Sequence, residues 1–595
     1  METITVFGPK HGSPLSLPSR TNMCWEMKPS RFPLTSVRGK PAKQVGLKVS
    51  ASCDRPISKL PPSKWTNYFH SVLVDVSEMD VLEREIEALK PNVREMLMSS
   101  KGYDSVKKRS LMIYLLVSLG LAYHFEEEIE KSLKDGFEKI DEIIAGEDDL
   151  YTISTIFWVF RTYGYNMSSD VFRRFKEENG KFKESLIEDA RGMLSLYEAA
   201  HLGTTTDYIL DEALDFASNN LVSLAEDGMC PSHLSTHIRN ALSISQHWNM
   251  EIIVAVQYIR FYEQEVGHDE MLLKFAKLNF NLVQRLYLQE VKILTKWYKD
   301  QDIHSKLPPY YRPVVTEMHF FSTATFFEPQ FSHARILQTK LFMAELLVDD
   351  TCDRYATFSE VESLINSLQR WAPDDAMDTH PDYLKVVFKF ILNAFEECEK
   401  ELRPQGRSYS LEQTKEEYKR FAKSNLDLAK LAQAGNVPSF EEYMEVGKDE
   451  IGAFVIVAGS LMGMDNIDAV EAYDFLKSRS KFSQSSAEIV RYLNDLAGFE
   501  DDMRRGCVST GLNCYMNQYG VTETEVFREF RKMVMNTCKI MNEEFLKTTD
   551  VPLRVLKTNF SCVRSGFVGY NEGEGVTYPE GKITKYLTSL YVDQI

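Results

Sequence analysis

Three neighbouring aspartates are the residues of this 595-residue chain whose types and spacing point most directly to chemistry. Asp349, Asp350 and Asp353 end the stretch LQTKLFMAELLVDDTCD, which begins at Leu337. Residues four apart share one helix face, so Asp349 and Asp353 should lie together with Asp350 beside them. Burying three carboxylates is unfavourable, and a hard divalent cation such as Mg²⁺ removes the difficulty because it prefers oxygen ligands. The alternative is a solvated acidic helix end, because this short pattern also arises by chance.

A second group of oxygen donors lies in the stretch SSAEIVRYLNDLAGFEDDMRRG, which begins at Ser485. Asn494, Gly498 and Asp502 are spaced by four, and Arg491 lies three residues before Asn494. On a helix these residues fall on roughly one side. Metal ions held between two such helices, together with arginines, can bind a diphosphate and stabilise it as a leaving group. The ordinary alternative for Arg491 is a structural ion pair.

Both groups require helices that end near the carboxylates. In the first stretch the apolar residues recur at spacings of four, three and four, as on one helix face. These residues are Leu337, Leu341, Ala344 and Val348. In the second stretch Ile489, Leu493 and Leu496 form a similar stripe. We predict that this helix begins with a capping box of Ser485 and Glu488 and ends at Gly506.

The rest of the chain predicts an all-α fold. Helical apolar patterns follow one another from Ser58 onward, and no long stretch alternates with a period of two. Pro91 is expected to break or restart one of these helices. A glycine and a shift in charge near residues 265–275 indicate a boundary. We therefore predict two helical domains, at residues 55–270 and 271–595, preceded by a separate segment at residues 1–54.

The first 52 residues differ in composition from the remainder. They hold eight Lys and Arg, seven Ser and only two acidic residues, and they lack helical periodicity. This composition is typical of an organelle transit peptide, which would be cleaved somewhere between about residue 30 and residue 54. A disordered tail without a targeting signal is the alternative.

Net charge and hydropathy exclude other classes of protein. A formal charge of −18 argues against nucleic acid as a partner, because binding it requires a basic face. The longest apolar run, Leu111 to Tyr123, is shorter than the roughly 20 residues of a membrane span. Nine scattered cysteines without CxxC pairs indicate reduced thiols.

The motifs identify the chain as similar to plant class I terpene synthases. Asp349–Asp353 matches the DDxxD motif of that family, and Asn494–Asp502 resembles its second metal motif, (N/D)Dxx(S/T/G)xxxE. The resemblance extends from about residue 55 to the C-terminus. Further matching stretches are Arg55-Pro56 with Trp65 as a shortened R-x-x8-W signature, LLKFAKLNFNLVQ from Leu272, LTKWYKD from Leu294, FFEPQFSHAR from Phe326 and YNEGEGVTYPEGK from Tyr570.

The resemblance implies an architecture and a metal. The N-terminal domain would be an α-barrel without class II activity, in keeping with the absence of a DxDD motif. The C-terminal domain would be the class I helical bundle, binding three Mg²⁺ ions with the diphosphate, or Mn²⁺ in their place. The glycine-rich tail from Gly566 to Gly575 would close over the site as a mobile lid. The implied metal ligands are Asp349, Asp350, Asp353, Asn494 and Asp502, with Asp495 as a further candidate.

The resemblance also implies residues that contact the substrate. Arg312, at the first arginine of the family's RxR motif, and Arg491 would bind the diphosphate. Phe321 and Tyr570, with Phe320 as a weaker candidate, would present aromatic faces to the cation. Packing in the core is the alternative for each aromatic residue.

Three positions depart from the family pattern. Val314 replaces the second arginine of RxR, which weakens the anchoring of the diphosphate there. Phe321 stands where a tryptophan is common, which should reshape the cation pocket. Asp502 stands where glutamate is usual, so Asp501 or Glu500 could take over the ligand role.

We expect a Mg²⁺-dependent lyase that ionises geranylgeranyl diphosphate and cyclises the cation to a macrocyclic or polycyclic diterpene. The expected location is the plastid, in the chloroplast stroma, where geranyl and geranylgeranyl diphosphates are found. The alternatives are a sesterterpene synthase acting on geranylfarnesyl diphosphate and a sesquiterpene synthase acting on farnesyl diphosphate. A chain-elongating prenyltransferase and an inactive helical scaffold are alternatives from other classes. We expect a monomer whose partner is the small-molecule substrate.

Overall fold

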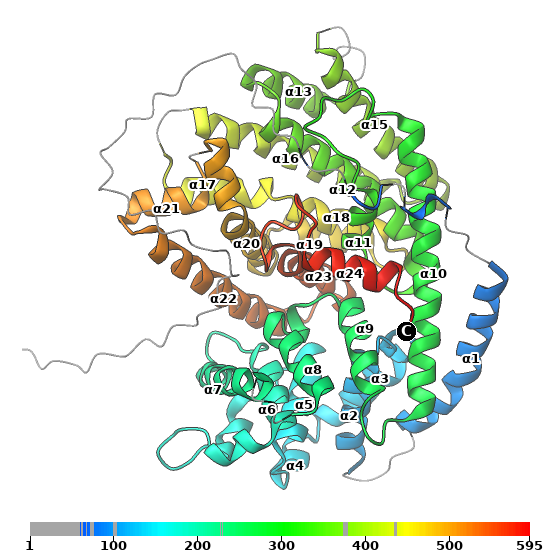
Figure 1. The fold of residues 1–595 in the computed structure, drawn as a ribbon, viewed down its shortest axis with the longest axis vertical. Coiled ribbons are helices and arrows are strands. Elements are labelled where there is room, and N and C mark those ends of the chain that lie inside the picture. Colours follow the sequence, from blue (N-terminus) through cyan, green and yellow to red (C-terminus); the bar gives the residue numbers. More distant parts are fainter. Residues whose placement is uncertain are drawn as a thin grey trace, which may run out of the picture. The chain divides into compact units, whose positions relative to one another are not determined.

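The described part of the protein is built from helices and loops (Figure 1). The computed structural model describes residues 60, 63–66, 68–71, 76–98, 104–226, 228, 230–372, 379–433, 437–507 and 509–595. Within these ranges there is no strand, and an isolated bridge joins Lys176 and Phe182. The predicted all-α class is confirmed. The predicted transit peptide at residues 1–54 and the Arg55-Pro56 signature lie outside the described residues.

The N-terminal set of helices packs around α5, whose side chains are buried on almost every face. The sequence of α5, LYTISTIFWVFRT, is apolar all round, as expected for a helix surrounded by others. Pro91 does not interrupt α1, so the predicted break there is wrong. The helices are α1 (Val76–Met98), α2 (Asp104–Ser118), α3 (Glu126–Phe137), α4 (Ile140–Ala145), α5 (Leu150–Thr162), α6 (Ala190–Ala200), α7 (Tyr208–Glu226), α8 (Ser232–Ser243) and α9 (Glu251–Tyr262).

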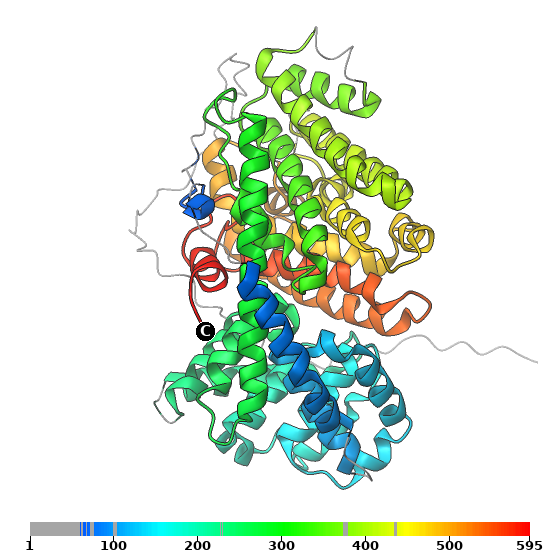
Figure 2. The ribbon, with the colours of Figure 1, turned by 90° about the vertical axis from the view of Figure 1, so that its right-hand side faces the viewer.

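The second set of helices begins with α10, which also packs against the first set. Figure 2 shows α1 lying along α10, and α9 also contacts α10. The helices are α10 (Glu270–Gln301), α11 (Val315–Ser322), α12 (Ser332–Arg354), α13 (Phe358–Arg370), α15 (Asp382–Leu402), α16 (Ser408–Gln433), α17 (Phe440–Glu450), α18 (Ala453–Gly463), α19 (Ala469–Lys477), α20 (Lys481–Arg505), α21 (Gly511–Tyr519), α22 (Glu523–Lys547), α23 (Leu553–Tyr570) and α24 (Lys582–Tyr591).

Short 3₁₀ helices connect several of these elements. They are η1 (Tyr68–Ser71), η2 (Ala122–Phe125), η3 (Ser169–Phe175), η4 (Glu184–Glu188), η5 (Gln246–Trp248), η6 (Pro329–Phe331) and η7 (Arg403–Gln405). Buried polar contacts also join the two helix sets: Asn542 donates to the carbonyl of Gly203 at 3.1 Å, and Arg564 donates to Glu251 at 2.6 Å. Such contacts satisfy polar groups that the interface removes from water.

The two motif helices, α12 and α20, end where the sequence predicts. Gly506 ends α20 with a positive φ of 79°, a conformation that glycine adopts without strain. The start of α20 differs from the prediction. Ser480 caps it by accepting the Ser483 N–H at 3.2 Å, whereas Ser485 lies inside the helix and donates to the Lys481 carbonyl at 2.8 Å. The predicted capping box is wrong because an earlier serine offers the same cap.

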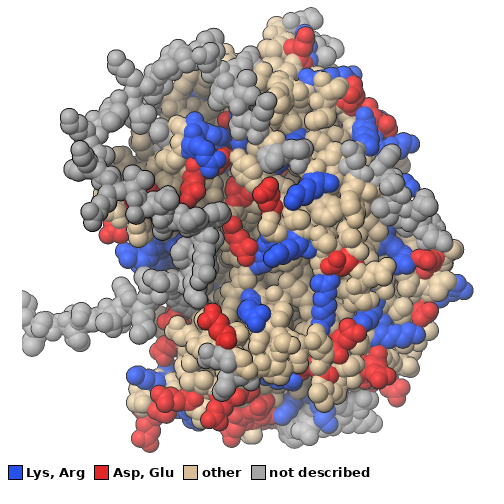
Figure 3. Space-filling model, viewed as in Figure 1, with Lys and Arg blue, Asp and Glu red and all other residues tan. Residues whose placement is uncertain are grey.

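On the face drawn in Figure 3, acidic and basic side chains are interspersed rather than gathered into a basic stripe. Among the described helices, none combines the length and the apolar character needed to cross a membrane.

Candidate active site

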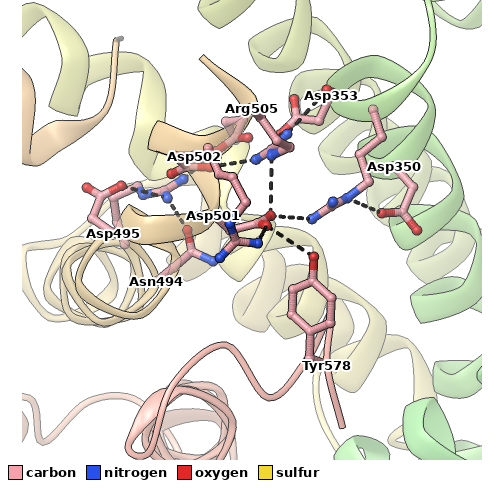
Figure 4. Close-up of polar contacts among 12 residues, drawn as sticks. Asp350, Asp353, Asn494, Asp495, Asp501, Asp502, Arg505 and Tyr578 are labelled. Carbon is pink, nitrogen blue, oxygen red and sulfur yellow. Dashed lines mark hydrogen bonds and ion pairs between the residues drawn. The ribbon is translucent and has the colours of Figure 1, made fainter. Parts of the chain in front are cut away.

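The ends of α12 and α20 meet at the mouth of one cavity of about 230 Å³. Asp349 and Asp353 line it from α12, and Asn494 and Asp502 line it from α20. Figure 4 shows Asp353 on one side, facing the carboxylates and the amide of α20 on the other. The fold therefore brings together four of the five predicted metal ligands, from two segments about 145 residues apart in the sequence.

Apolar and aromatic side chains make up part of the lining of this cavity, and Phe321 and Tyr570 are among them. The position of both residues fits the predicted contact with a hydrocarbon or a cation. Phe320, the weaker candidate, is fully buried and packs against Phe321 and Tyr586, so it belongs to the core. The other apolar lining residues include Met318, Phe342, Leu346, Phe421, Ile456 and Val490.

The carboxylates of α12 lie in an environment that disfavours their charge. Burial, together with Asp353 and Glu450, raises the pKa of Asp349 well above its ordinary value. Burial raises the pKa of Asp350 to about 6, although Arg354 lies 3.2 Å away and partly offsets the shift. Asp350 is 2% exposed and turns toward Arg354, and it is not among the described residues that line the cavity. Its oxygen atoms therefore do not face the same space as those of Asp349.

The carboxylates of α20 have basic partners on their own helix. Arg491 donates to Asp495 at 2.8 Å and to Asn494, and it also reaches Glu450 on α17 at 2.7 Å. Arg505 donates to Asp502 at 2.5 Å. Burial nevertheless raises the pKa of Asp502 to about 6, with help from Asp353, and that of Glu450 to about 7. Asp502 therefore faces the other motif, as predicted.

Asp501, the alternative ligand, is held in a different network. It lies 3.3 Å from Arg354 of α12 and 3.3 Å from Arg505. The hydroxyl of Tyr578 donates to it at 3.1 Å from the loop after α23, as Figure 4 shows. Arg354 and Asp501 thus join the two motif helices to that loop.

The donor set fits Mg²⁺. Carboxylate and amide oxygens are the ligands that Mg²⁺ prefers, and carboxylates that raise one another's pKa are stabilised by a bound cation. One oxygen of Asp350, Oδ2, is buried with no hydrogen-bond partner among the described residues. Within the described part of the chain, no three acidic, His or Cys side chains already converge on one point.

Arg312 lies beside the site rather than on its surface. It is 3% exposed, donates to the carbonyl of Val576 at 3.4 Å, and is not among the described cavity-lining residues. Burial lowers the pKa of its guanidinium, and the nearby Asp350 and Glu317 oppose the shift. Its Nε and Nη1 atoms are buried without partners among the described residues, which is consistent with an anion-binding role.

The predicted lid begins and ends later in the sequence than expected. Gly566 and Gly569 lie inside α23, so the loop over the site comprises residues 571–581. A Cβ at Gly569 would lie 3.1 Å from Val576, and one at Gly575 would lie 2.6 Å from the Gly569 carbonyl oxygen. These two glycines therefore allow close packing at the base of the loop.

Sequence reasoning missed several residues of the site. Glu450, Arg354, Arg505 and Tyr578 belong to the charge network, and Glu345 lines the cavity one turn before Asp349. Arg505 could have been found, because it lies three residues after Asp502 on the same helix. Glu450 and Tyr578 come from segments whose proximity only the fold establishes.

Comparison with known proteins agrees with this geometry. Residues 64–242 match a family described as terpene synthase, N-terminal domain, and residues 299–540 match the terpene synthase family, metal binding domain. Terpenoid synthase 9 of Arabidopsis thaliana is 58% identical over 601 residues, covering 100% of this chain and 99% of the relative. Alpha-barbatene synthase of the same plant is 50% identical over 541 residues, covering 90% of this chain and 97% of the relative.

Solved structures show the same fold. Limonene synthase with 2-fluorolinalyl diphosphate superposes with a TM-score of 0.83 at 26% identity, covering 91% of this chain and 100% of that one. Isoprene synthase from grey poplar leaves (Populus x canescens), in complex with three Mg²⁺ ions and dimethylallyl-S-thiolodiphosphate, gives a TM-score of 0.77 at 25% identity. It covers 87% of this chain and 97% of that one.

Proposed function

The chain belongs to the terpene synthase family, and we propose that it ionises geranylgeranyl diphosphate and cyclises the resulting cation to a diterpene. One observation carries this proposal. Two oxygen-rich helix ends, on α12 and α20, meet at a cavity that apolar side chains also line. A prenyl diphosphate has the matching form, with a charged head on a long hydrocarbon chain.

The head group would bind where the two helices meet. Asp349, Asp353, Asn494 and Asp502 would hold Mg²⁺, which when bound supplies positive charge to the departing diphosphate. Arg491 lies among these groups, and the unpartnered donors of Arg312 are buried close by. Donors that are already in place when charge develops on the leaving group lower the barrier to ionisation.

The hydrocarbon chain would extend into the apolar part of the cavity. Phe321 and Tyr570 would face the cation, which an aromatic ring attracts without reacting with it. The loop of residues 571–581, held to α20 through Tyr578 and Asp501, would exclude the water that otherwise quenches the cation.

The proposed chain length of the substrate rests on location and on the N-terminal signature. The composition of residues 1–54 favours a plastid, and we propose the chloroplast stroma as the location. Pools of geranyl and geranylgeranyl diphosphate are expected there. The shortened R-P-x8-W signature, which lacks the paired arginines, argues against a typical cyclic monoterpene synthase. Together these features favour the diterpene precursor, handled by a monomeric enzyme.

A sesquiterpene synthase acting on farnesyl diphosphate is the second candidate. It is favoured by the 50% identity with the relative named alpha-barbatene synthase, over 97% of that relative's length. The two candidates share one ionisation chemistry and differ only in how much of the cavity the hydrocarbon fills.

The test is a direct comparison of substrates. The purified protein with Mg²⁺ is offered geranyl, farnesyl, geranylgeranyl and geranylfarnesyl diphosphates separately, and extracts are analysed by gas chromatography–mass spectrometry. We expect a cyclic product from the geranylgeranyl substrate at the highest kcat/KM. A product mainly from farnesyl diphosphate would replace the diterpene proposal with the second candidate. No product from any substrate would overturn both.

A further inference from the structure

Glu345 is a carboxyl group of the cavity that the proposed binding of the head group does not use. Glu345 lies on α12, one turn before Asp349, and lines the cavity although it is only 8% exposed. Its Oε1 atom is buried without a hydrogen-bond partner among the described residues. Leaving a buried polar atom unpaired is unfavourable. Packing alone does not explain why a glutamate occupies this position.

The surroundings of Glu345 are those of the hydrocarbon rather than those of the head group. It shares the cavity wall with Phe342, Leu346 and Phe421. Burial alone raises the pKa of Glu345, whereas Asp353 and Glu450 contribute to the raised pKa of Asp349. Its carboxyl is therefore separate from the acidic cluster at the mouth.

One oxygen of this carboxyl lies close to the start of α18. A Cβ built on Gly452 would lie 3.5 Å from Oε2 of Glu345, and Gly452 is the residue that precedes the first turn of α18. The free N–H groups of a helix N-terminus attract an anion. Burial makes a carboxylate a stronger base, because a proton that it takes restores the favoured neutral form.

We propose that Glu345 is the base that ends the reaction by removing a proton from the cyclised cation. The step rests on the proposed function and involves no other reagent. A C–H bond on the carbon next to the cationic centre breaks, and its electron pair becomes the π bond of a new alkene. The proton moves to a carboxylate oxygen of Glu345 and leaves to solvent after the product departs. The product is then a hydrocarbon, and the position of its last double bond is set by which C–H group faces Glu345.

Another buried glutamate provides a matched control. Glu328, just before α12, also has an oxygen, Oε2, without a hydrogen-bond partner among the described residues, and burial raises its pKa to about 7. It is not among the described residues that line the cavity. Removing its charge tests the general effect of neutralising a buried carboxyl in this protein.

The experiment compares Glu345→Gln, Glu345→Asp and Glu328→Gln with the wild-type protein. The substrate is the prenyl diphosphate that gives the wild-type protein its highest kcat/KM. Release of inorganic diphosphate measures ionisation, gas chromatography–mass spectrometry measures the products, and Tm measures folding. In Glu345→Gln we expect diphosphate release within about 3-fold of wild type, because ionisation precedes the proton transfer. The main hydrocarbon should fall by about 10²-fold, the lower end of the range for a general base, with water-capture alcohols or other isomers replacing it.

The other two variants sharpen the result. Glu345→Asp keeps the carboxyl but draws it back by one methylene, so it should retain hydrocarbon products with a changed ratio of double-bond isomers. Glu328→Gln should leave the product profile unchanged.

Two outcomes would overturn the proposal. One is an unchanged product profile in Glu345→Gln, and the other is the same altered profile in Glu328→Gln. If Glu345→Gln does not fold, Glu345→Asp decides: an unchanged isomer ratio contradicts the proposal, and a changed ratio supports it. Failure of the proposed function is distinct, because the wild-type protein would then give no terpene product at all.

Discussion

The two acidic helix ends differ in how their charge is balanced. On α12, Asp349 faces the cavity close to other carboxylates, and burial and like charges raise its pKa. On α20, Asp502 is paired with Arg505 at 2.5 Å, and the neighbouring Asn494 accepts a hydrogen bond from Arg491. Asp349 therefore depends more strongly on a cation from outside the chain, whereas the α20 residues are already partly compensated.

This difference indicates separate roles for two motifs that look alike in the sequence. A site whose carboxylates repel one another gains most when a cation binds. A site with built-in arginines keeps its geometry before the cation arrives and can offer donors to a diphosphate. We infer that the carboxylates of α12 gain most from binding the metal. The residues of α20, which are paired with arginines, keep the geometry of the site before the metal binds.

The largest expected effect is that of Asp349→Asn. Loss of this carboxylate should lower kcat/KM by about 10²- to 10³-fold, the scale for removing one preorganised charge-stabilising group. Because the folded protein disfavours the charge of Asp349, the variant should also have a higher Tm than wild type without metal. Mg²⁺ should then raise its Tm less than it raises that of wild type. A lower Tm without metal would contradict the inference that the charge of Asp349 on α12 is less well balanced than the charges on α20.

Asp350→Asn is the matched control for that variant. Asp350 is next in the sequence but turns toward Arg354 and away from the cavity. We expect a smaller loss, about 10-fold or less, because this aspartate contributes mainly by holding Arg354. A loss as large as that of Asp349→Asn would show that both carboxylates hold the metal.

The second prediction concerns Asp502 and its neighbour. Asp502→Ala should lose most activity, about 10²-fold, because its carboxylate faces Asp353 across the cavity mouth. Asp501→Asn should lose less, because Asp501 is engaged with Arg354, Arg505 and Tyr578. Steady-state kinetics over a Mg²⁺ titration measures both variants. Near-wild-type turnover of Asp502→Ala would transfer the ligand role to Asp501 or Glu500.

The third prediction is that binding of Mg²⁺ weakens as pH falls. Burial raises the pKa of Asp502 to about 6 and that of the neighbouring Glu450 to about 7. These groups are ionised at pH 8 and increasingly protonated below pH 7, so protons then compete with the metal. We expect the affinity for Mg²⁺, measured as the rise in Tm on adding Mg²⁺ alone, to fall about 10-fold between pH 8 and pH 5.5.

Asp502→Asn is the control for this pH dependence. It removes one of the competing proton sites, so the change in affinity between the two pH values should be smaller than in wild type. An equal or steeper dependence would mean that groups elsewhere cause the effect.

The smallest expected effect is that of Tyr578→Phe. The change removes the hydroxyl that donates to Asp501 at 3.1 Å and so loosens the loop of residues 571–581 from α20. One hydrogen bond contributes about 1 kcal/mol, so kcat should fall by about 5-fold. Limited proteolysis within the loop should become faster, while Tm changes little. Unchanged proteolysis would show that the glycine packing at Gly569 and Gly575 holds the loop without Tyr578.

Much of the fold could be predicted because its signals are local. The apolar stripes of α12 and α20 require only helical periodicity, and Gly506 ends α20 because its backbone conformation suits glycine. Predictions from local sequence signals were wrong where two signals pointed to different helix boundaries. Ser480 caps α20 in place of Ser485, and α1 continues through Pro91.

The site was predicted in part. Asp349, Asp353, Asn494, Asp502, Phe321 and Tyr570 were predicted, and the fold brings them to one cavity. Asp350 and Arg312 also lie in this region but are not among the described lining residues, and each contacts another residue, Arg354 and the Val576 carbonyl respectively. Side-chain direction depends on such neighbours, which spacing along one helix does not specify.

The sequence by itself determined the class of the protein, the helices and the identity of most oxygen donors. Helix formation and the metal preference of a carboxylate depend on residue type and short-range spacing. Only the tertiary structure decided which carboxylates are compensated and which face the cavity. Arg354 meets Asp501, and Tyr578 meets Asp501, across 147 and 77 residues of chain. The placement of Glu345 beside Gly452 is of the same kind, because burial and charge balance depend on neighbours that the fold brings together from distant segments.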